Sequence, residues 1–241
     1  MPPVPGGPTN VGQITLEPVP VLLYSLTSFG DHLRVVDPAT GTTVSSVAIS
    51  LHGSTVTGGT ALATLPVTRE LWAALTIGGQ SRLVTIDPTT GVASPIGNTE
   101  DLFDALAFDS AGMLCGVTRD DADTPETLYR LSTVNATPSF VPSLGPGGFG
   151  EASTFKPDDG LLYHASGLSD QIFGSIDPDS LRTTDFPLLG DRIDEPFAMT
   201  YQGSGVFLMT DLEFLRFGIT TGGEATFIGV VDHQSKGLAC R

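Results

Sequence analysis

The chain has 241 residues with 29 glycines, 18 prolines and only 16% charged residues, a profile that is typical of short strands joined by tight turns and argues against a helical bundle. Its 27 acidic and 11 basic residues give a formal net charge of −16, which excludes nucleic acid as a partner because phosphate binding depends on clustered lysines and arginines. No apolar run approaches the ~18 residues that a membrane helix needs, so membrane insertion is not expected.

The chain begins with a proline-rich segment that is predicted to have no core of its own. We assign residues 1–14 to an extended N-terminal arm and residues 15–241 to a single domain. Proline cannot donate to a backbone ladder, so this arm suits lying across a surface better than entering a sheet. We therefore expect Met1–Gly12 to lie against a neighbouring subunit. The prolines of this assembly arm are Pro2, Pro3, Pro5 and Pro8.

A strand-and-turn motif then recurs at the interval of propeller blades. Its clearest copies are LRVVDPATG and LVTIDPTTG, followed by IFGSIDPDS, with degenerate copies in LYRLSTVNA and FLRFGITTGG. The last apolar strand residue of each copy serves as an anchor, and successive anchors are 50, 45, 45 and 41 residues apart. Five anchors predict five units. The anchors are Val36, Ile86, Leu131, Ile176 and Phe217.

The Asp-Pro-x-Thr-Gly words are interpreted as turns rather than metal-binding loops. Proline presets φ, the aspartate side chain bonds to backbone two residues further on, and glycine accepts a positive φ. These three properties together predict a hairpin from the third to the fourth strand of each unit.

Two more recurrent strands precede each anchor. The nearer one contains a bulky residue, as in VLLYSLT, ELWAALT and LLYHAS, and the farther one is made of small residues, as in TALATL, DALAFD and EASTFK. Small residues fit the innermost strand because blades converge on a narrow channel. The aromatic residues Tyr24, Trp72 and Tyr163 are expected to pack between neighbouring blades. With the strand after the turn, each unit is a four-stranded antiparallel meander.

The two ends of the repeat are predicted to complete each other. The first unit lacks its small-residue strand, and the chain ends in GLACR, which matches that strand in composition and spacing. We therefore expect Gly237–Arg241 to pair with Val21–Thr27, because this closure removes two exposed sheet edges. The predicted fold is all-β, a five-bladed β-propeller whose C-terminal strand completes the first blade.

The words LVTIDPTTG, SPIGN and DALAFDSAGMLCGVT resemble the blade words of bacterial repeat β-propeller proteins, a group that overlaps lactonase-like and quinoprotein-like propellers. The resemblance covers nearly everything after Leu22. It implies the architecture, and because such propellers include enzymes as well as cell-surface binding proteins, it implies no particular activity.

The loops that enter the innermost strands are expected to meet at one mouth of the channel, where propellers bind ligands. Asp104 and Glu151 on adjacent blades could bind Ca²⁺ there through their oxygens. The alternative is that these acids are solvated and Lys236 neutralises one of them; we favour it and expect no cofactor beyond weak Ca²⁺ binding. The predicted mouth residues are Thr60, Asp104, Glu151, Phe197 and Lys236, with Asp194 and Glu195 close behind.

Other reactive side chains are assigned structural roles. Cys115 and Cys240 are expected to be buried free thiols, and the histidines show no zinc-binding spacing. A second acidic cluster, DDADTPE, lacks the ligand spacing of a calcium loop, so a solvated loop is expected. Its acids are Asp120, Asp121, Asp123 and Glu126.

No catalytic constellation is visible, which favours a noncatalytic interaction or scaffold module over an enzyme. We expect a structural or adhesive component of a larger extracellular or virion-like assembly, with protein subunits as partners. One alternative is a metal-dependent lactonase-like or lyase-like enzyme that uses Asp104 and Glu151 around a cation. Another is a lectin-like propeller that binds carbohydrate.

Overall fold

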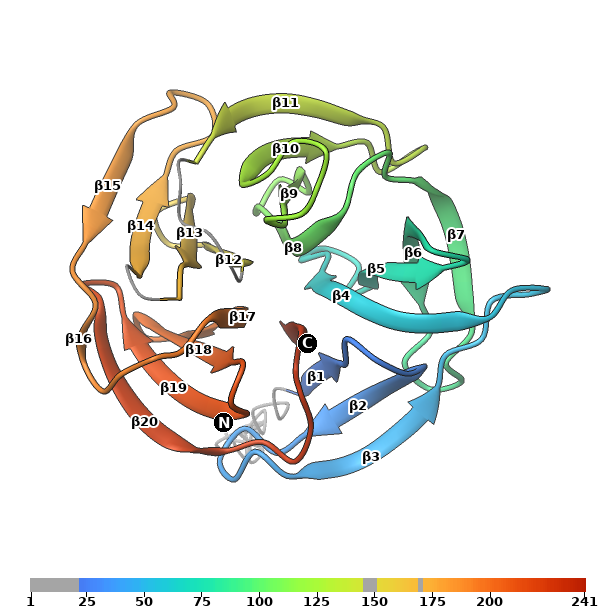
Figure 1. Ribbon diagram of the computed structural model, residues 1–241, viewed down its shortest axis with the longest axis horizontal. Coiled ribbons are helices and arrows are strands. Elements are labelled where there is room, and N and C mark those ends of the chain that lie inside the picture. The colour runs from blue at the N-terminus through green and yellow to red at the C-terminus, as the bar shows by residue number, and fades with distance from the viewer. Residues whose placement is uncertain (1–21, 145–150, 169–170) are drawn as a thin grey trace, which may run out of the picture.

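The computed structural model describes residues 22–144, 151–168 and 171–241. In these ranges the chain forms five sheets arranged as a ring, with the innermost strands around a central axis (Figure 1). The predicted all-β, five-bladed propeller is thereby confirmed. The described ranges contain no helix long and apolar enough to cross a membrane. The predicted assembly arm, Met1–Gly12, lies outside them.

Each blade is a meander that runs from the channel to the rim. The first blade contains β1 (Leu23–Leu26), β2 (His32–Val36), β3 (Thr43–Ala48) and β21 (Gly237–Cys240). The second contains β4 (Val56–Thr64), β5 (Leu71–Ile77), β6 (Gln80–Ile86) and β7 (Ala93–Asn98). The third contains β8 (Phe103–Phe108), β9 (Leu114–Thr118), β10 (Thr127–Leu131) and β11 (Pro138–Ser143).

The last two blades follow the same plan. The fourth contains β12 (Glu151–Lys156), β13 (Leu161–Ser166), β14 (Ile172–Ile176) and β15 (Thr183–Phe186). The fifth contains β17 (Pro196–Gly203), β18 (Val206–Asp211), β19 (Leu215–Thr220) and β20 (Glu224–Val230). This blade differs from the predicted four strands, because the short β16 (Leu189–Gly190) pairs with β20 in parallel.

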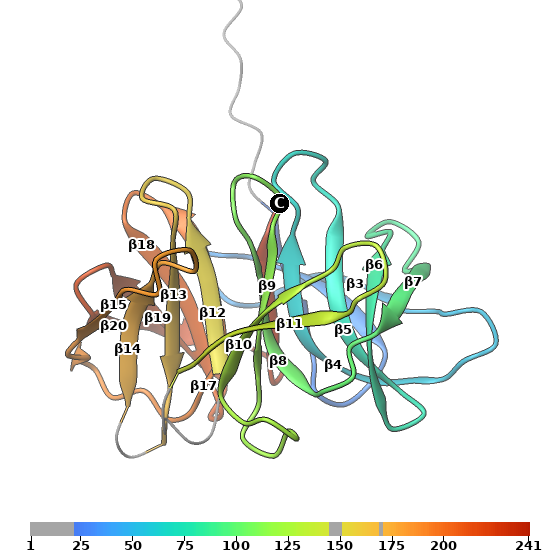
Figure 2. The same ribbon diagram turned by 90° about the horizontal axis from the view of Figure 1, so that it is seen from above.

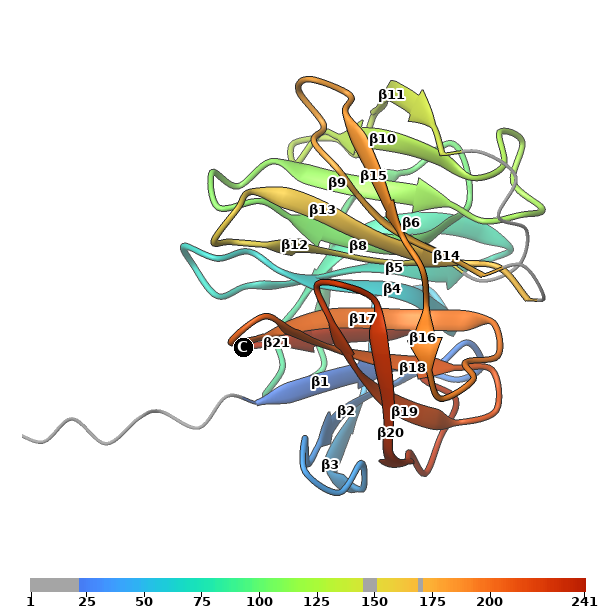
Figure 3. The same ribbon diagram turned by 90° about the vertical axis from the view of Figure 1, so that its left-hand side faces the viewer.

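The ring closes through the C-terminal strand, as predicted. β21 pairs antiparallel with β1, with Cys240 opposite Leu23 and Gly237 opposite Leu26. Two further backbone bonds join Leu22 and Arg241, at 2.9 and 2.8 Å. Figure 3 shows β21 beside β1, so the first blade is assembled from both ends of the described chain.

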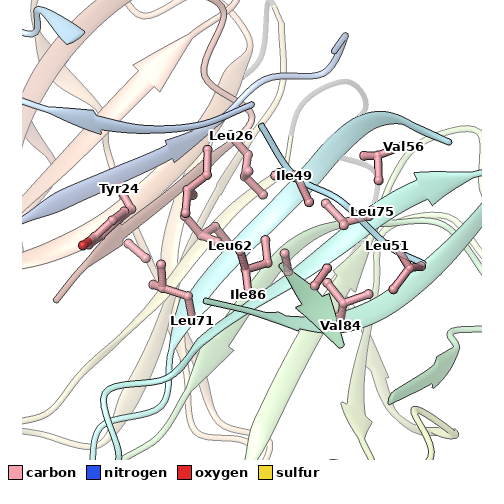
Figure 4. Close-up of a cluster of buried hydrophobic side chains, with 14 of the residues drawn as sticks. Tyr24, Leu26, Ile49, Leu51, Val56, Leu62, Leu71, Leu75, Val84 and Ile86 are labelled. Atoms are coloured by element: carbon pink, nitrogen blue, oxygen red, sulfur yellow. The ribbon is translucent and has the colours of Figure 1, made fainter. Parts of the chain in front are cut away.

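Neighbouring blades are held together by apolar side chains. In Figure 4, Tyr24 and Leu26 of the first blade lie in one cluster with Leu62, Leu71 and Leu75 of the second. The predicted aromatic positions also pack between blades. The Trp72 ring lies 5.5 Å from that of Phe108, and the Tyr163 ring lies 4.7 Å from that of Phe207.

The Asp-Pro words form the predicted turns. In the first blade, Asp37 Oδ1 accepts a hydrogen bond from the backbone N–H of Ala39 at 2.7 Å. The equivalent bonds run from Thr89 to Asp87 at 2.8 Å and from Asp179 to Asp177 at 2.9 Å. The metal-loop interpretation is thus unnecessary, because these carboxylates are used by the turns themselves.

The turn glycine has a second role, which the sequence did not indicate. The chain that leaves one outer strand crosses the outer turn of the next blade, as at the parallel bridge between Ser50 and Val92. A Cβ atom on Gly91 would lie 2.0 Å from the carbonyl oxygen of Ala48 in the preceding blade. A Cβ atom on Gly41 would likewise lie 2.5 Å from the carbonyl oxygen of Val230. Glycine is therefore needed at Gly41 and Gly91, where the rims of two blades overlap.

Two glycine substitutions should separate this contact from backbone strain. Gly53 and Gly91 have nearly the same φ, 72° and 73°, but a Cβ on Gly53 would meet nothing within 4 Å. We expect Gly53→Ala to lower the free energy of unfolding by about 1–2 kcal/mol, because alanine is strained in the left-handed backbone conformation. Gly91→Ala should cost a further ~1–3 kcal/mol, because the rims must separate. Urea unfolding measures both, and equal losses would contradict a close contact between the rims.

Candidate functional site

One end of the central channel opens into a cavity of about 620 Å³, here called the mouth. The turns between β1 and β2 and after β9 contribute to it, as do the segments that enter the innermost strands. The predicted residues that line it are Thr60, Asp104, Glu195, Phe197 and Lys236. Lining residues that the sequence did not indicate include Phe29, Arg119, Asp120, Asp121, Leu212 and Gln234.

An ion pair forms the floor of the mouth. Lys236 Nζ donates to Asp104 Oδ2 at 2.7 Å and lies 3.9 Å from the centre of the Phe197 ring. The two charged side chains are only 12% and 7% exposed. The second carboxylate oxygen of Asp104, Oδ1, is buried and has no hydrogen-bond partner among the described residues. The lysine that precedes β21 therefore neutralises the central acid across the ring.

Glu151 does not line the mouth. It is fully buried on β12 and its Oε2 is paired with His164 Nε2 on the adjacent strand β13. The sequence spacing of the histidines did not indicate this contact, which arises because antiparallel pairing places His164 opposite Ser153, two residues from Glu151. Burial raises the pKa of Glu151, and this outweighs the lowering effect of His164.

Below the floor the channel narrows to a neck with a void of about 10 Å³. The small residues of the innermost strands line it, as predicted. Three buried side-chain oxygens around it have no hydrogen-bond partner in the described part of the chain, namely Asp104 Oδ1, Glu151 Oε1 and Ser153 Oγ. A void of this size matches a single water-sized group.

This donor set fits Ca²⁺ poorly. Calcium takes six to eight oxygen ligands, whereas the remaining oxygens of Asp104 and Glu151 are already bound by Lys236 and His164. Within the described part of the chain, no group of three or more His, Cys, Asp or Glu side chains could hold a metal. Weak Ca²⁺ binding stays a prediction, which metal analysis after dialysis would check.

The wall of the mouth carries further charges. Arg119 forms a two-pronged ion pair with Asp121, in which Nη2 lies 2.8 Å from Oδ2. Glu195 is partly buried and has an unusual φ of 32°. Its burial raises its pKa, Lys236 lowers it, and the charges of Asp120 and Asp104 raise it further. The mouth thus retains an excess of negative charge after two acids have been paired.

The DDADTPE loop was expected to be solvated, but hydrogen bonds hold it against Asp101. The carboxylate of Asp101 accepts hydrogen bonds from the N–H groups of Asp123 and Thr124 at 2.9 and 3.1 Å. Glu126 at its end is only 7% exposed, so the solvated interpretation is wrong for that residue. Asp194, in another loop, lies 4.0 Å from Arg192 and outside the mouth.

One serine, histidine and aspartate lie in hydrogen-bonded order. His233 Nε2 is 2.7 Å from Ser25 Oγ, and His233 Nδ1 is 2.7 Å from Asp232 Oδ1. A nucleophile must reach its substrate, but Ser25 is fully buried and its hydroxyl also bonds Ser235 at 2.7 Å. Asp232 additionally accepts from Thr43 on β3 at 2.9 and 2.7 Å. The constellation is a structural network that fastens the closing segment to the first blade.

The two cysteines are free, as expected. Cys115 is buried, and this burial raises the pKa of its thiol to about 12. Cys240 is only partly buried, which differs from the expectation, because it lies on the last strand next to the channel end opposite the mouth. Neither thiol is activated for nucleophilic chemistry.

The buried acid Glu151 should make folding pH-dependent. Its pKa is higher in the folded state than the ordinary value of 4.5. Above that pH the folded state still holds a proton that the unfolded state has released, so the free energy of unfolding falls as the pH rises. The free energy of unfolding of Glu151→Gln minus that of the parent should therefore be larger at pH 8 than at pH 4. Urea unfolding at both pH values, with exposed Glu224→Gln as control, checks this; a difference of opposite sign would contradict it.

No protein-family model and no curated protein sequence matches this chain. Solved structures share its fold. A nidogen/laminin complex matches with a TM-score of 0.60 and 11% identity, covering 91% of this chain and 97% of the other. A protein of unknown function from Bacteroides caccae matches with a TM-score of 0.58 and 10% identity over 92% and 99% of the two chains. A luciferin-regenerating enzyme matches with 0.52 and 14% identity over 90% and 83%. Likeness at this identity shows the propeller fold alone.

Proposed function

We propose that this protein is a noncatalytic interaction module that contacts its partner through the mouth face. The observation that carries the proposal is the open cavity of about 620 Å³ with Phe29 at its rim. The Phe29 side chain is 84% exposed. An exposed aromatic residue beside a pocket is the typical anchor of a protein interface. The module would serve as a structural or adhesive part of a larger assembly, extracellular or on a virion surface.

The chemistry of the polar groups supports binding over catalysis. Asp104 is held in an ion pair, and the Ser25 hydroxyl is fully buried. Groups fixed in this way hold a surface rigid and are not available to transfer protons. One similar fold comes from a nidogen/laminin complex, which gives a precedent for a propeller within a protein assembly. The lactonase-like alternative has less support because the donors around Asp104 and Glu151 fit a cation poorly, and no described feature favours a repeated sugar site.

Two exposed apolar residues on opposite faces provide the test. Phe29 lines the mouth, whereas Val67, 78% exposed, lies in the turn between β4 and β5, whose Pro66 and Arg69 line the other channel end. Figure 2, in which the disc is seen edge-on, shows this turn on the same side as the C terminus. Phe29→Ser should weaken binding of the native partner at least ~10-fold. Val67→Ser should leave it unchanged, and the reverse result would refute the mouth as the contact surface.

A further inference from the structure

The mouth carries more negative than positive side chains. Four carboxylates line it, and two of them are neutralised by Lys236 and Arg119. The other two, Asp120 and Glu195, accept no side-chain hydrogen bond from the described residues. Clefts lined by one sign of charge concentrate ions of the opposite sign. The mouth therefore favours a cationic group.

The floor shows which cation the site accommodates. The ammonium group of Lys236 lies over the Phe197 ring and bonds one oxygen of Asp104. The remaining oxygen of this carboxylate, Asp104 Oδ1, is buried and has no hydrogen-bond partner among the described residues. An aromatic face beside a carboxylate is the arrangement that binds ammonium groups elsewhere. The protein's own lysine thus occupies one such position, and an unpartnered acceptor remains beside it.

The backbone at Glu195 has an unusual conformation. Its φ of 32° is rare for a residue other than glycine. Strained backbone persists where the surrounding structure imposes it, and it concentrates at binding sites. The side chain of Glu195 lines the mouth together with Lys236 and Phe197.

We infer that the mouth binds the side-chain ammonium group of a lysine displayed by a protein partner. The inference rests on the proposed function and names the group that the interface recognises. Glu195 and Asp120 accept the ammonium hydrogens, and Phe29 and Leu212 contact the apolar stem and its surroundings. A lysine matches this geometry because its compact charge lies at the end of an apolar stem that can reach into a cavity.

The probe is Nα-acetyl-lysine methylamide, titrated into the full chain and followed by amide NMR. We expect saturable shifts at residues lining the mouth, with a Kd on the order of 1 mM. The norleucine analogue, which has the stem without the charge, should bind at least ~10-fold more weakly. Equal binding of both probes, tighter binding of the arginine analogue or of free propylammonium, or the absence of saturable shifts would overturn the inference.

Paired variants test the acceptors. Asp120→Asn with Glu195→Gln should weaken lysine binding at least ~10-fold, because both carboxylates that accept the ammonium hydrogens lose their charge. Asp185→Asn with Glu224→Gln removes the same charge from the exposed outer strands β15 and β20 and should leave binding unchanged. Equal weakening by both pairs would show that only net charge matters and would overturn the site.

The two proposals fail in different ways. If Phe29→Ser weakens binding of the native partner but the lysine probe does not bind, the mouth is the interface and the proposed ligand class is wrong. If the lysine probe binds and Phe29→Ser has no effect on the partner, the mouth is a cation site but not the partner's contact surface, which contradicts a lysine displayed by a protein.

Discussion

Deleting Gly237–Arg241 is expected to abolish cooperative folding of the propeller. Leu238 and Ala239 on this strand are only 4% and 2% exposed, and its backbone completes the ladder along β1. Burial of one leucine contributes ~1.5–3 kcal/mol, and the lost ladder adds to this. The total approaches the ~5–15 kcal/mol by which folded domains are stable.

The deletion should also promote aggregation, because β1 becomes an exposed edge beside the channel. Calorimetry and light scattering measure the two effects. Arg241→Ala is the control, since the backbone of Arg241, rather than its side chain, bonds Leu22. A truncated protein that stays monomeric and melts as the full chain does would contradict closure through β21.

Replacing Arg216 with methionine should be the most damaging single substitution at the closure. Arg216 is 1% exposed, and its guanidinium donates to the carbonyl oxygens of Pro38 and Ala39 at 2.9 and 2.8 Å. These carbonyls belong to the Asp-Pro turn of the first blade, so Arg216 joins the fifth blade to the first. Each hydrogen bond from the charged guanidinium contributes ~1.5–3 kcal/mol, so we expect the free energy of unfolding to fall by about 3–5 kcal/mol.

A matched control exists in the third blade. Arg130 occupies the same repeat position, one residue before the anchor, and donates to Pro178 of the next turn at 3.0 Å. Its side chain is 39% exposed and pairs with exposed Asp179, so Arg130→Met should cost at most ~1 kcal/mol. Thermal unfolding of both variants tests this difference. Equal losses of stability in Arg216→Met and Arg130→Met would show that burial at the closure is unimportant.

The architecture could be predicted from sequence because its determinants are local and repeated. The Asp-Pro turns depend on neighbouring residues, and the closure follows from a strand that is missing at one end and present at the other. The contact of Gly91 with Ala48 was not predictable, because it depends on how two blades overlap at the rim.

The candidate site was predicted only in part. Placing residues at the entrances of the innermost strands located Asp104 and Lys236, because repeat register determines that position. It misplaced Glu151, since burial and the cross-strand partner His164 depend on β13. It missed Phe29 and Arg119, whose turns have no repeated sequence. Polar networks such as Ser25, His233 and Asp232 join residues about 200 positions apart and carry no local signal.

Hydrogen exchange of the protein alone and bound to its native partner tests most directly whether the mouth is the contact surface. We expect slower exchange at residues 27–31 and 119–126, which form turns beside the mouth, and no change at residues 66–69 on the opposite face. Protection confined to residues 66–69 or to the outer strands of the blades, with the mouth turns unchanged, would contradict it.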